Sequence, residues 1–266
     1  MVKGLYTAYT GMTNEMKRLD VLANNLANSN TTGYKKEGTT SMSFAEEYAI
    51  KIKDSSDYGL HKRLGTIYMG AHLGEVYTDW QEGSLKVTDK STDFAVGGEG
   101  FFAVAFTDKE GNTSMKLTRD GSFTLNANGY LVTADGDYVL NATGALNGEP
   151  TVANYIQIDP NASFSVDQMG YVYQNGQVVG TIGLVNVDNY DYIEKYGENM
   201  YNVLDGGNLV AADGTILQGT LESSNVNVVS EMVNMITIQR AYEAGQKVIT
   251  SIDETLNISA TQVGKV

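Results

Sequence analysis

Few side chains in this sequence of 266 residues have the type and spacing that catalysis needs. The two histidines, His61 and His72, lie in a basic, glycine-rich stretch and belong to no His-x-x-x-His or Ser/His/Asp pattern. The Gly-Gly-Glu-Gly run at 97–100 precedes a predicted strand and no lysine follows it, so it lacks the features of a phosphate-binding loop. The absence of cysteine excludes a thiol nucleophile. We therefore expect a protein that is not an enzyme and carries no cofactor.

Acidic residues supply the remaining candidates, for calcium binding or for glycoside hydrolysis. Asp-Gly-Asp at 135–137 and Asp-Asn-Tyr-Asp at 188–191 lack the spaced ligands and the closing glutamate of an EF-hand loop, so we predict no metal site. A glycosidase needs two carboxylates about 5–10 Å apart, and no spacing among the 32 acidic residues selects such a pair. A secreted carbohydrate-binding β-module is an alternative, with Tyr171 and Tyr173 as stacking platforms.

The distribution of charge bears on possible partners. A formal net charge of −14 disfavours binding to nucleic acid and to anionic lipid surfaces. Between residues 120 and 239 there are 14 acidic residues and one basic residue, Lys195, whereas the first 36 residues are mildly basic. No apolar run approaches the roughly 18 residues that a membrane span requires. The first ten residues also lack the apolar stretch of a cleavable secretory signal.

Hydrophobic spacing predicts a long helix at each end of the chain. Near the N-terminus the stripe steps by three and four, with four apolar residues seven apart as in a coiled-coil seam. The run Asn-Ser-Asn-Thr-Thr-Gly at 28–33 should end this helix, because these residues favour caps and turns. The stripe consists of Leu5, Ala8, Met12, Glu15, Leu19, Leu22 and Leu26.

The C-terminal segment repeats this pattern, with an N-cap expected at Ser223 or Ser224, or at the competing Asn225 or Asn227. Its stripe consists of Met235, Ile238, Tyr242, Gly245, Ile249, Ile252, Leu256, Ser259 and Val263. Between 228 and 238 the apolar band is wider than one partner helix would cover, which predicts burial against further helices or further molecules.

The middle of the chain predicts β-structure. The continuous apolar run at 101–106 predicts a buried strand. Shorter runs, Tyr-Ile-Gln-Ile at 155–158 among them, also predict strands, and Asn-Gly or Asp-Gly pairs such as Asn175–Gly176 between runs are strong hairpin signals. The predicted fold class is therefore α+β: terminal helices paired as an antiparallel coiled coil, and a central, mainly antiparallel β-domain of sandwich or barrel-like form. We divide the chain into a discontinuous terminal domain at 1–30 and 223–266, an extended arm at 31–90 and the β-domain at 91–222.

Three blocks of this sequence carry recognisable motifs. The first is Leu-Ala-Asn-Asn-Leu-Ala-Asn-Ser-Asn-Thr-Thr-Gly-Tyr-Lys-Lys at 22–36. The second is Thr-Asp-Phe-Ala-Val-Gly-Gly-Glu-Gly-Phe-Phe-Ala-Val at 92–104, followed by Leu-Thr-Arg-Asp-Gly-Ser-Phe-Thr-Leu at 117–125. The third is Gly-Thr-Leu-Glu-Ser-Ser-Asn-Val-Asn-Val-Val-Ser-Glu-Met at 219–232, continued by Ile-Gln-Arg-Ala-Tyr-Glu at 238–243. These blocks resemble the bacterial flagellar rod and hook proteins, with the rod proteins closest.

The resemblance implies a structural subunit of the flagellar basal-body rod, of distal type, with a proximal-rod or hook-type axial protein as the alternative. Its partners would be copies of itself, other rod and hook proteins and the flagellar type III export apparatus. It would lie in the cell envelope, outside the cytoplasm, without signal cleavage. The expected assembly interface consists of Leu5, Met12, Leu19, Leu22, Leu26, Val228, Val229, Met232, Met235, Ile238, Tyr242, Ile249, Ile252 and Leu256.

Overall fold

The computed structural model describes residues 2–45, 47–50, 63–197 and 199–263, so His61 lies outside the described residues. The chain forms two compact units. Unit 1 comprises Met1–Ala27, Lys36–Asp79 and Val226–Val266, and unit 2 comprises Asn28–Lys35 and Trp80–Asn225. The chain thus passes between the units after residues 27, 35, 79 and 225.

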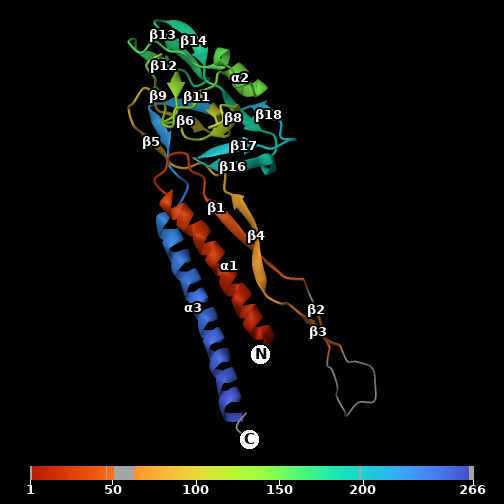
Figure 1. The fold of residues 1–266 in the computed structure, drawn as a ribbon. Coiled ribbons are helices and arrows are strands. Elements are labelled where there is room, and N and C mark those ends of the chain that lie inside the picture. Colours follow the sequence, from red (N-terminus) through yellow and green to blue (C-terminus); the bar gives the residue numbers. More distant parts are fainter. Residues whose placement is uncertain (1, 46, 51–62, 198, 264–266) are drawn as a thin grey trace. The chain divides into compact units, whose positions relative to one another are not determined.

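Unit 1 contains the two long helices that the sequence predicts. Helix α1 spans Val2–Ala27, and α3 spans Val228–Ile258 and continues as a π-helical turn, Ser259–Val263. The two helices lie side by side along their length (Figure 1). They run in opposite directions, because Gly4 on α1 lies opposite Ile252 on α3 and Met12 lies opposite Gly245.

The ends of these helices follow from local chemistry. Helix α1 ends at Ala27, immediately before the Asn-Ser-Asn turn at 28–30, as predicted. Asn227 is the N-cap of α3: its side-chain oxygen accepts a hydrogen bond of 3.1 Å from the backbone N–H of Ser230. Among the four candidate caps in the sequence, Asn227 therefore holds this position.

Two pairs of antiparallel strands complete unit 1. Strand β1 (Glu37–Ser43) pairs with β4 (Ala71–Thr78), and β2 (Glu47–Ile50) pairs with β3 (Arg63–Ile67). Strands β1 and β4 pack against α1. The described part of 31–90 therefore contains regular strands, and in unit 1 one pair of them lies along a helix.

Unit 2 is mainly antiparallel β-structure, as predicted. Its largest sheet has nine strands, seven of which run in the order β16, β17, β8, β7, β11, β10, β9, while β15 pairs with both β7 and β18. Their bounds are β7 Phe101–Thr107, β8 Thr113–Thr118, β9 Thr124–Leu125, β10 Leu131–Val132, β11 Tyr138–Val139, β15 Leu184–Val187, β16 Ile193–Gly197, β17 Met200–Val203 and β18 Leu209–Ala211.

Smaller elements surround this sheet. One sheet has the order β12 (Phe164–Val166), β13 (Tyr171–Gln174), β14 (Gln177–Thr181). Two further pairs are β5 (Leu85–Val87) with β20 (Thr220–Glu222), and β6 (Phe94–Gly97) with β19 (Thr215–Gln218). Helix α2 spans Ala142–Asn147, and 3₁₀ turns form at Val152–Asn154 and Tyr190–Tyr192.

Strand β7 organises the core of unit 2, because both of its faces are buried. Phe102 and Val104 belong to one hydrophobic cluster, while Phe101, Ala103 and Ala105 belong to a second. This alternation follows from the twofold side-chain period of a strand. The continuous apolar run that predicts a buried strand at 101–106 is confirmed.

Turn signals in the sequence are also borne out in unit 2. Asn175 and Gly176 join β13 to β14 with φ angles of 52° and 79°, the positive pair that a type I′ hairpin turn requires. The glycine-rich run at 97–100 connects β6 to β7, with Gly98 and Gly100 at positive φ. The strand predicted at 155–158 is wrong: this segment makes isolated bridges at Tyr155 and Gln157 only.

Candidate assembly interface

Glycines of both long helices lie at the contact between α1 and α3. A Cβ atom placed on Gly245 would lie 2.7 Å from Cγ of Met12, so Met12 occupies the space that a larger residue at 245 would fill. Nearer the N-terminus of α1, a Cβ on Gly4 would lie 3.8 Å from Cδ1 of Ile252. Gly245, a small residue of the predicted C-terminal stripe, therefore leaves room for a side chain of α1.

The expected interface residues divide into three groups by exposure. Leu22 and Ile238 are buried. Half-buried are Met12, Leu19, Leu26, Val228, Met235, Tyr242, Ile249 and Ile252. The exposed residues are Leu5, Val229, Met232 and Leu256. In the isolated chain most of the expected interface residues are thus buried or half-buried, and four are open to solvent; the interface itself stays a prediction.

The exposed residues on α3 are part of a continuous stripe, which we call the apolar ridge: Val229, Met232, Val233 and Ile236. Their exposed fractions are 71%, 49%, 56% and 51%. The spacing of i, i+3, i+4 and i+7 places all four on one face of the helix. This face lies about half a turn around α3 from Gly245 and Ile252, which contact α1.

Polar contacts fix both helices to the rest of unit 1. Asn25 is 1% exposed; its Nδ2 donates to the carbonyl of Glu37 at 2.7 Å, and its Oδ1 accepts from the N–H of Glu37 at 2.9 Å. At the start of α3, buried Glu231 lies 2.7 Å from Nζ of Lys36. A carboxylate in the first turn also interacts favourably with the helix dipole.

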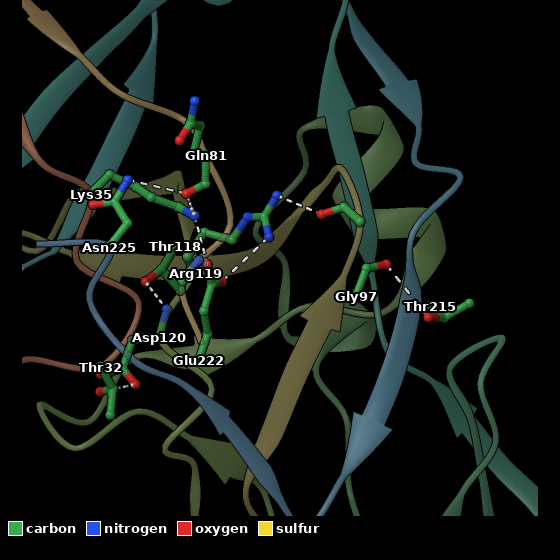
Figure 2. Close-up of polar contacts among 12 residues, drawn as sticks. Thr32, Lys35, Gln81, Gly97, Thr118, Arg119, Asp120, Thr215, Glu222 and Asn225 are labelled. Atoms are coloured by element: carbon green, nitrogen blue, oxygen red, sulfur yellow. Dashed lines mark hydrogen bonds and ion pairs between the residues drawn. The ribbon is translucent and has the colours of Figure 1, made fainter. Parts of the chain in front are cut away.

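A buried cluster of charges lies in unit 2, where Lys35, Arg119 and Glu222 come together (Figure 2). Nζ of Lys35 donates to Oε1 of Glu222 at 2.6 Å and to the carbonyl of Gln81 at 2.8 Å. Arg119 approaches Oε2 of Glu222 at 3.4 Å and donates to the carbonyl of Gly98 at 2.9 Å. The three charged side chains are at most 5% exposed.

Burial determines the electrostatics of this cluster. It lowers the pKa of Lys35 by penalising the ammonium form, and the neighbouring carboxylate of Glu222 opposes that shift. The backbone N–H of Gly83 also donates to Oε1 of Glu222, at 2.9 Å. Charges that are buried this deeply persist in proteins because partners compensate them, so Lys35 and Arg119 both depend on the carboxylate of Glu222.

Sequence reasoning missed this cluster, although a signal for it exists. Lys35 stands in the mildly basic N-terminal segment, and Glu222 in the acidic stretch. Their separation of 187 residues hides the pairing from any local pattern. Gly33 marks the same region: it has a φ of 66°, and a Cβ there would lie 2.4 Å from the backbone carbon of Arg119.

Three family models match this chain, one for each block of the sequence. "Flagella basal body rod protein" covers residues 5–35, "Flagellar hook protein FlgE/F/G D1 domain" covers 95–174, and "Flagellar basal body rod FlgEFG protein C-terminal" covers 217–262. Each matched range contains one member of the buried charge cluster: Lys35, Arg119 and Glu222, respectively.

Curated relatives match over almost the entire chain. The flagellar basal-body rod protein FlgG of Bacillus subtilis is 34% identical over 271 residues, covering 96% of this chain and 97% of the relative. FlgG of Buchnera aphidicola subsp. Schizaphis graminum is 33% identical over 96% and 98%. FlgF of Caulobacter vibrioides is 34% identical over 97% and 98%. The chain belongs to the flagellar basal-body rod protein family.

Among the described residues no helix is long and apolar enough to cross a membrane. Within the same ranges, no group of three or more metal-binding side chains comes together. Tyr171 and Tyr173, the candidate glycan platform, are 40% and 36% exposed on β13.

Proposed function

We propose that this chain is a structural subunit of the bacterial flagellar basal-body rod and that it polymerises through its terminal helices into the axial tube. The observation that carries the proposal is the apolar ridge. Four large apolar side chains on one helical face are at least 49% exposed in the isolated chain. Exposed apolar surface of this kind is typical of protein–protein contacts, and in a rod-family protein the available partner is another rod subunit.

The proposal assigns a distinct role to each part of the expected interface. The stripes that include Met12, Leu22, Ile238 and Ile252 pair α1 with α3 as a coiled-coil seam within one subunit. The ridge contacts a neighbouring subunit. Such a contact joins different surfaces of two copies, and it generates an open helical polymer when the rotation between copies does not close a ring.

The same proposal includes the chain's place in the cell. Assembly into the basal body requires delivery beyond the cytoplasm, which we assign to the flagellar type III export apparatus without removal of a signal peptide. Other rod and hook proteins would adjoin this subunit along the axis. The distal position in the rod stays a prediction from the sequence, with the proximal-rod and hook-type positions as alternatives.

The substitution Val229→Glu tests the proposal without weakening the monomer. Residue 229 lies in the first turn of α3, where a carboxylate interacts favourably with the helix dipole and where glutamate is a better helix former than valine. We expect sedimentation velocity to show concentration-dependent assembly of the parent chain and loss of that assembly in the variant. Circular dichroism should show unchanged helix content.

Val152→Glu is the matched control, because Val152 is 69% exposed in unit 2 and Val229 is 71% exposed in unit 1. The control should assemble like the parent. If Val229→Glu assembles as well as the parent, the ridge is not part of the interface. A parent chain that stays monomeric at every concentration, alone and mixed with other rod proteins, would overturn the proposed function.

A further inference from the structure

Three Asn-Gly pairs occur in this sequence, at 128–129, 147–148 and 175–176. All three lie in unit 2, at turns or at the end of a short helix. The same dipeptide thus occurs in three structural settings of one chain. Asparagine before glycine is prone to a reaction of its own, because glycine has no side chain to hinder the approach of its backbone nitrogen to the asparagine amide.

The reaction is deamidation, and it needs no partner other than water. The backbone nitrogen of the glycine attacks Cγ of the asparagine, so that a C–N bond forms and the side-chain amide leaves as ammonia, which takes up the glycine proton through solvent. Water then opens the resulting succinimide at one of its two carbonyl carbons and gives aspartate or isoaspartate. A free glycine N–H and an asparagine side chain that can turn towards it are therefore the two structural requirements.

The pair at 128–129 does not have a free glycine N–H. The N–H of Gly129 donates to the carbonyl of Asn126 at 2.9 Å. Gly129 is buried, and a Cβ there would lie 2.3 Å from the carbonyl oxygen of Ile158. The N–H of Asn128 donates to Oδ1 of Asn126 at 3.0 Å, and its carbonyl accepts from Nε2 of Gln157 at 3.1 Å. Hydrogen bonds and close packing therefore hold this turn in place.

The pair at 147–148 is held by the end of helix α2. Asn147 is the last residue of this helix, and Gly148 follows it with a φ of 67°. The N–H of Gly148 donates to the carbonyl of Gly144, and the N–H of Glu149 donates to the same carbonyl at 3.0 Å. Attack by the nitrogen of Gly148 therefore requires the last turn of α2 to open first.

The pair at 175–176 meets both requirements. Asn175 and Gly176 are exposed in the two-residue loop that joins β13 to β14 (Figure 1). Within the described part of the chain, the N–H of Gly176 donates to no acceptor and the side chain of Asn175 forms no hydrogen bond. A Cβ on Gly176 would meet no atom within 4 Å. The attacking nitrogen and the amide it attacks are thus both free, in neighbouring residues of an open turn.

We propose that Asn175 is a site of spontaneous deamidation and that the fold directs the reaction to this one of the three Asn-Gly pairs. The inference goes beyond the proposed function and does not depend on assembly. Because the reaction consumes only water and releases only ammonia, its extent increases with the age of the chain. The modification therefore records how long a molecule has been folded.

The two products differ in their effect on the hairpin. A type I′ turn accepts Asp-Gly as well as Asn-Gly, so aspartate at 175 leaves the turn in place. Isoaspartate carries the main chain through its side-chain carbon and lengthens the loop by one backbone atom, which disrupts the pairing of Gln174 with Gln177. Gln174 is 7% exposed and donates to the carbonyls of Asp159 and Ala162, so this change also reaches a buried side chain.

Incubation of the full chain in dilute solution at mildly alkaline pH tests this selectivity. Mass spectrometry of proteolytic peptides measures deamidation at each pair, and a methyltransferase specific for isoaspartate detects the rearranged product. We expect deamidation at Asn175 to be at least about tenfold faster than at Asn128 and Asn147, because a hydrogen bond must break first at those two sites. In urea that unfolds the chain, the three rates should agree within about threefold, since the native contacts that separate them are lost.

Other results would overturn the inference. Equal native rates at the three pairs, or a faster reaction at Asn128 or Asn147, would show that a free N–H does not select the site. If Asn175 stays intact in the native chain but reacts in urea, the hairpin protects it. A preference for Asn175 that is as strong in urea as in the native chain would come from the flanking sequence and not from the fold.

Substitutions provide a second measurement. Asn175→Gly keeps a residue that a type I′ turn accepts but removes the amide, so it should abolish most of the ammonia that the native chain releases. Asn147→Gln, at an exposed position of α2, is the matched control and should release as much ammonia as the parent. Equal release from Asn175→Gly and the parent would place the reaction elsewhere. Hydrogen exchange of the β13 and β14 amides should be unchanged in Asn175→Asp and faster in the isoaspartate product.

Discussion

The two units bury their apolar residues in opposite ways. In unit 2 both faces of β7 are covered, and residues such as Phe94, Phe102 and Leu117 are completely buried. In unit 1 the described helices bury only Leu22 and Ile238 to a comparable degree, although each helix carries a long apolar stripe. Unit 2 therefore has a core of its own, whereas unit 1 leaves large apolar side chains of α3 open to solvent.

This difference explains how one chain can serve both as a stable particle and as a building block. A unit with a closed core gains its stability without partners. Long helices that pack on one face only gain much of theirs from contacts that form on assembly, because isolated helices are marginal in water. We therefore expect substitutions in unit 2 to change the stability of the monomer and substitutions on the ridge to change association.

Glu222→Leu should have the largest effect. It leaves Lys35 and Arg119 buried without their carboxylate, and breaking a buried ion pair from one side costs about 3–5 kcal/mol. Trp80, the single tryptophan, packs against Phe101 and Tyr201 in unit 2 and reports its unfolding by fluorescence in urea. Glu194→Leu, at an exposed glutamate, is the control and should change the unfolding free energy by less than about 0.5 kcal/mol. Equal urea midpoints of unfolding for Glu222→Leu and Glu194→Leu would contradict a structural role for the buried charge cluster.

The next largest difference is expected between Leu117→Ala in unit 2 and Leu256→Ala in unit 1, which compare the cost of truncating one leucine in each unit. Leu117 is fully buried, so its truncation should lower the unfolding free energy of unit 2 by about 2–5 kcal/mol. Leu256 is 42% exposed on α3, and its truncation should change the stability of the dilute monomer by less than about 0.5 kcal/mol. Urea titration measures both changes. A large loss of monomer stability in Leu256→Ala would mean that α3 is already covered within one chain.

Limited trypsin digestion requires no substitution and involves the smallest free energies, those of local opening. In dilute monomer we expect cleavage after Lys17, Arg240 and Lys247 in the helices before cleavage after Lys116 or Arg119 in unit 2, which are buried. Mass spectrometry of the fragments gives the order. At concentrations where the chain assembles, the helical sites should become protected. Protease-resistant helices in dilute solution would argue that the ends are rigid before assembly.

Local patterns predicted the elements of this protein well. The stripes of three and four residues indicated α1 and α3, and the Asn175–Gly176 pair indicated a hairpin, because both signals depend on neighbours within a few residues. The prediction of a strand at 155–158 was wrong because it, too, used only neighbours within a few residues. Its alternation is typical of a strand, but it forms only single bridges, to Tyr130 and Leu140.

The sequence by itself determined the terminal helices, the antiparallel β-middle and membership of the rod family, because periodicity, turn residues and ordered motif blocks are all properties of the linear chain. Only the tertiary structure decided that Lys35, Arg119 and Glu222 share one buried site and which face of α3 stays exposed. These outcomes depend on residues that are distant in sequence and adjacent in space. The energies of burial and of charge pairing depend on which residues meet in the folded chain, and no single segment of the sequence specifies those neighbours.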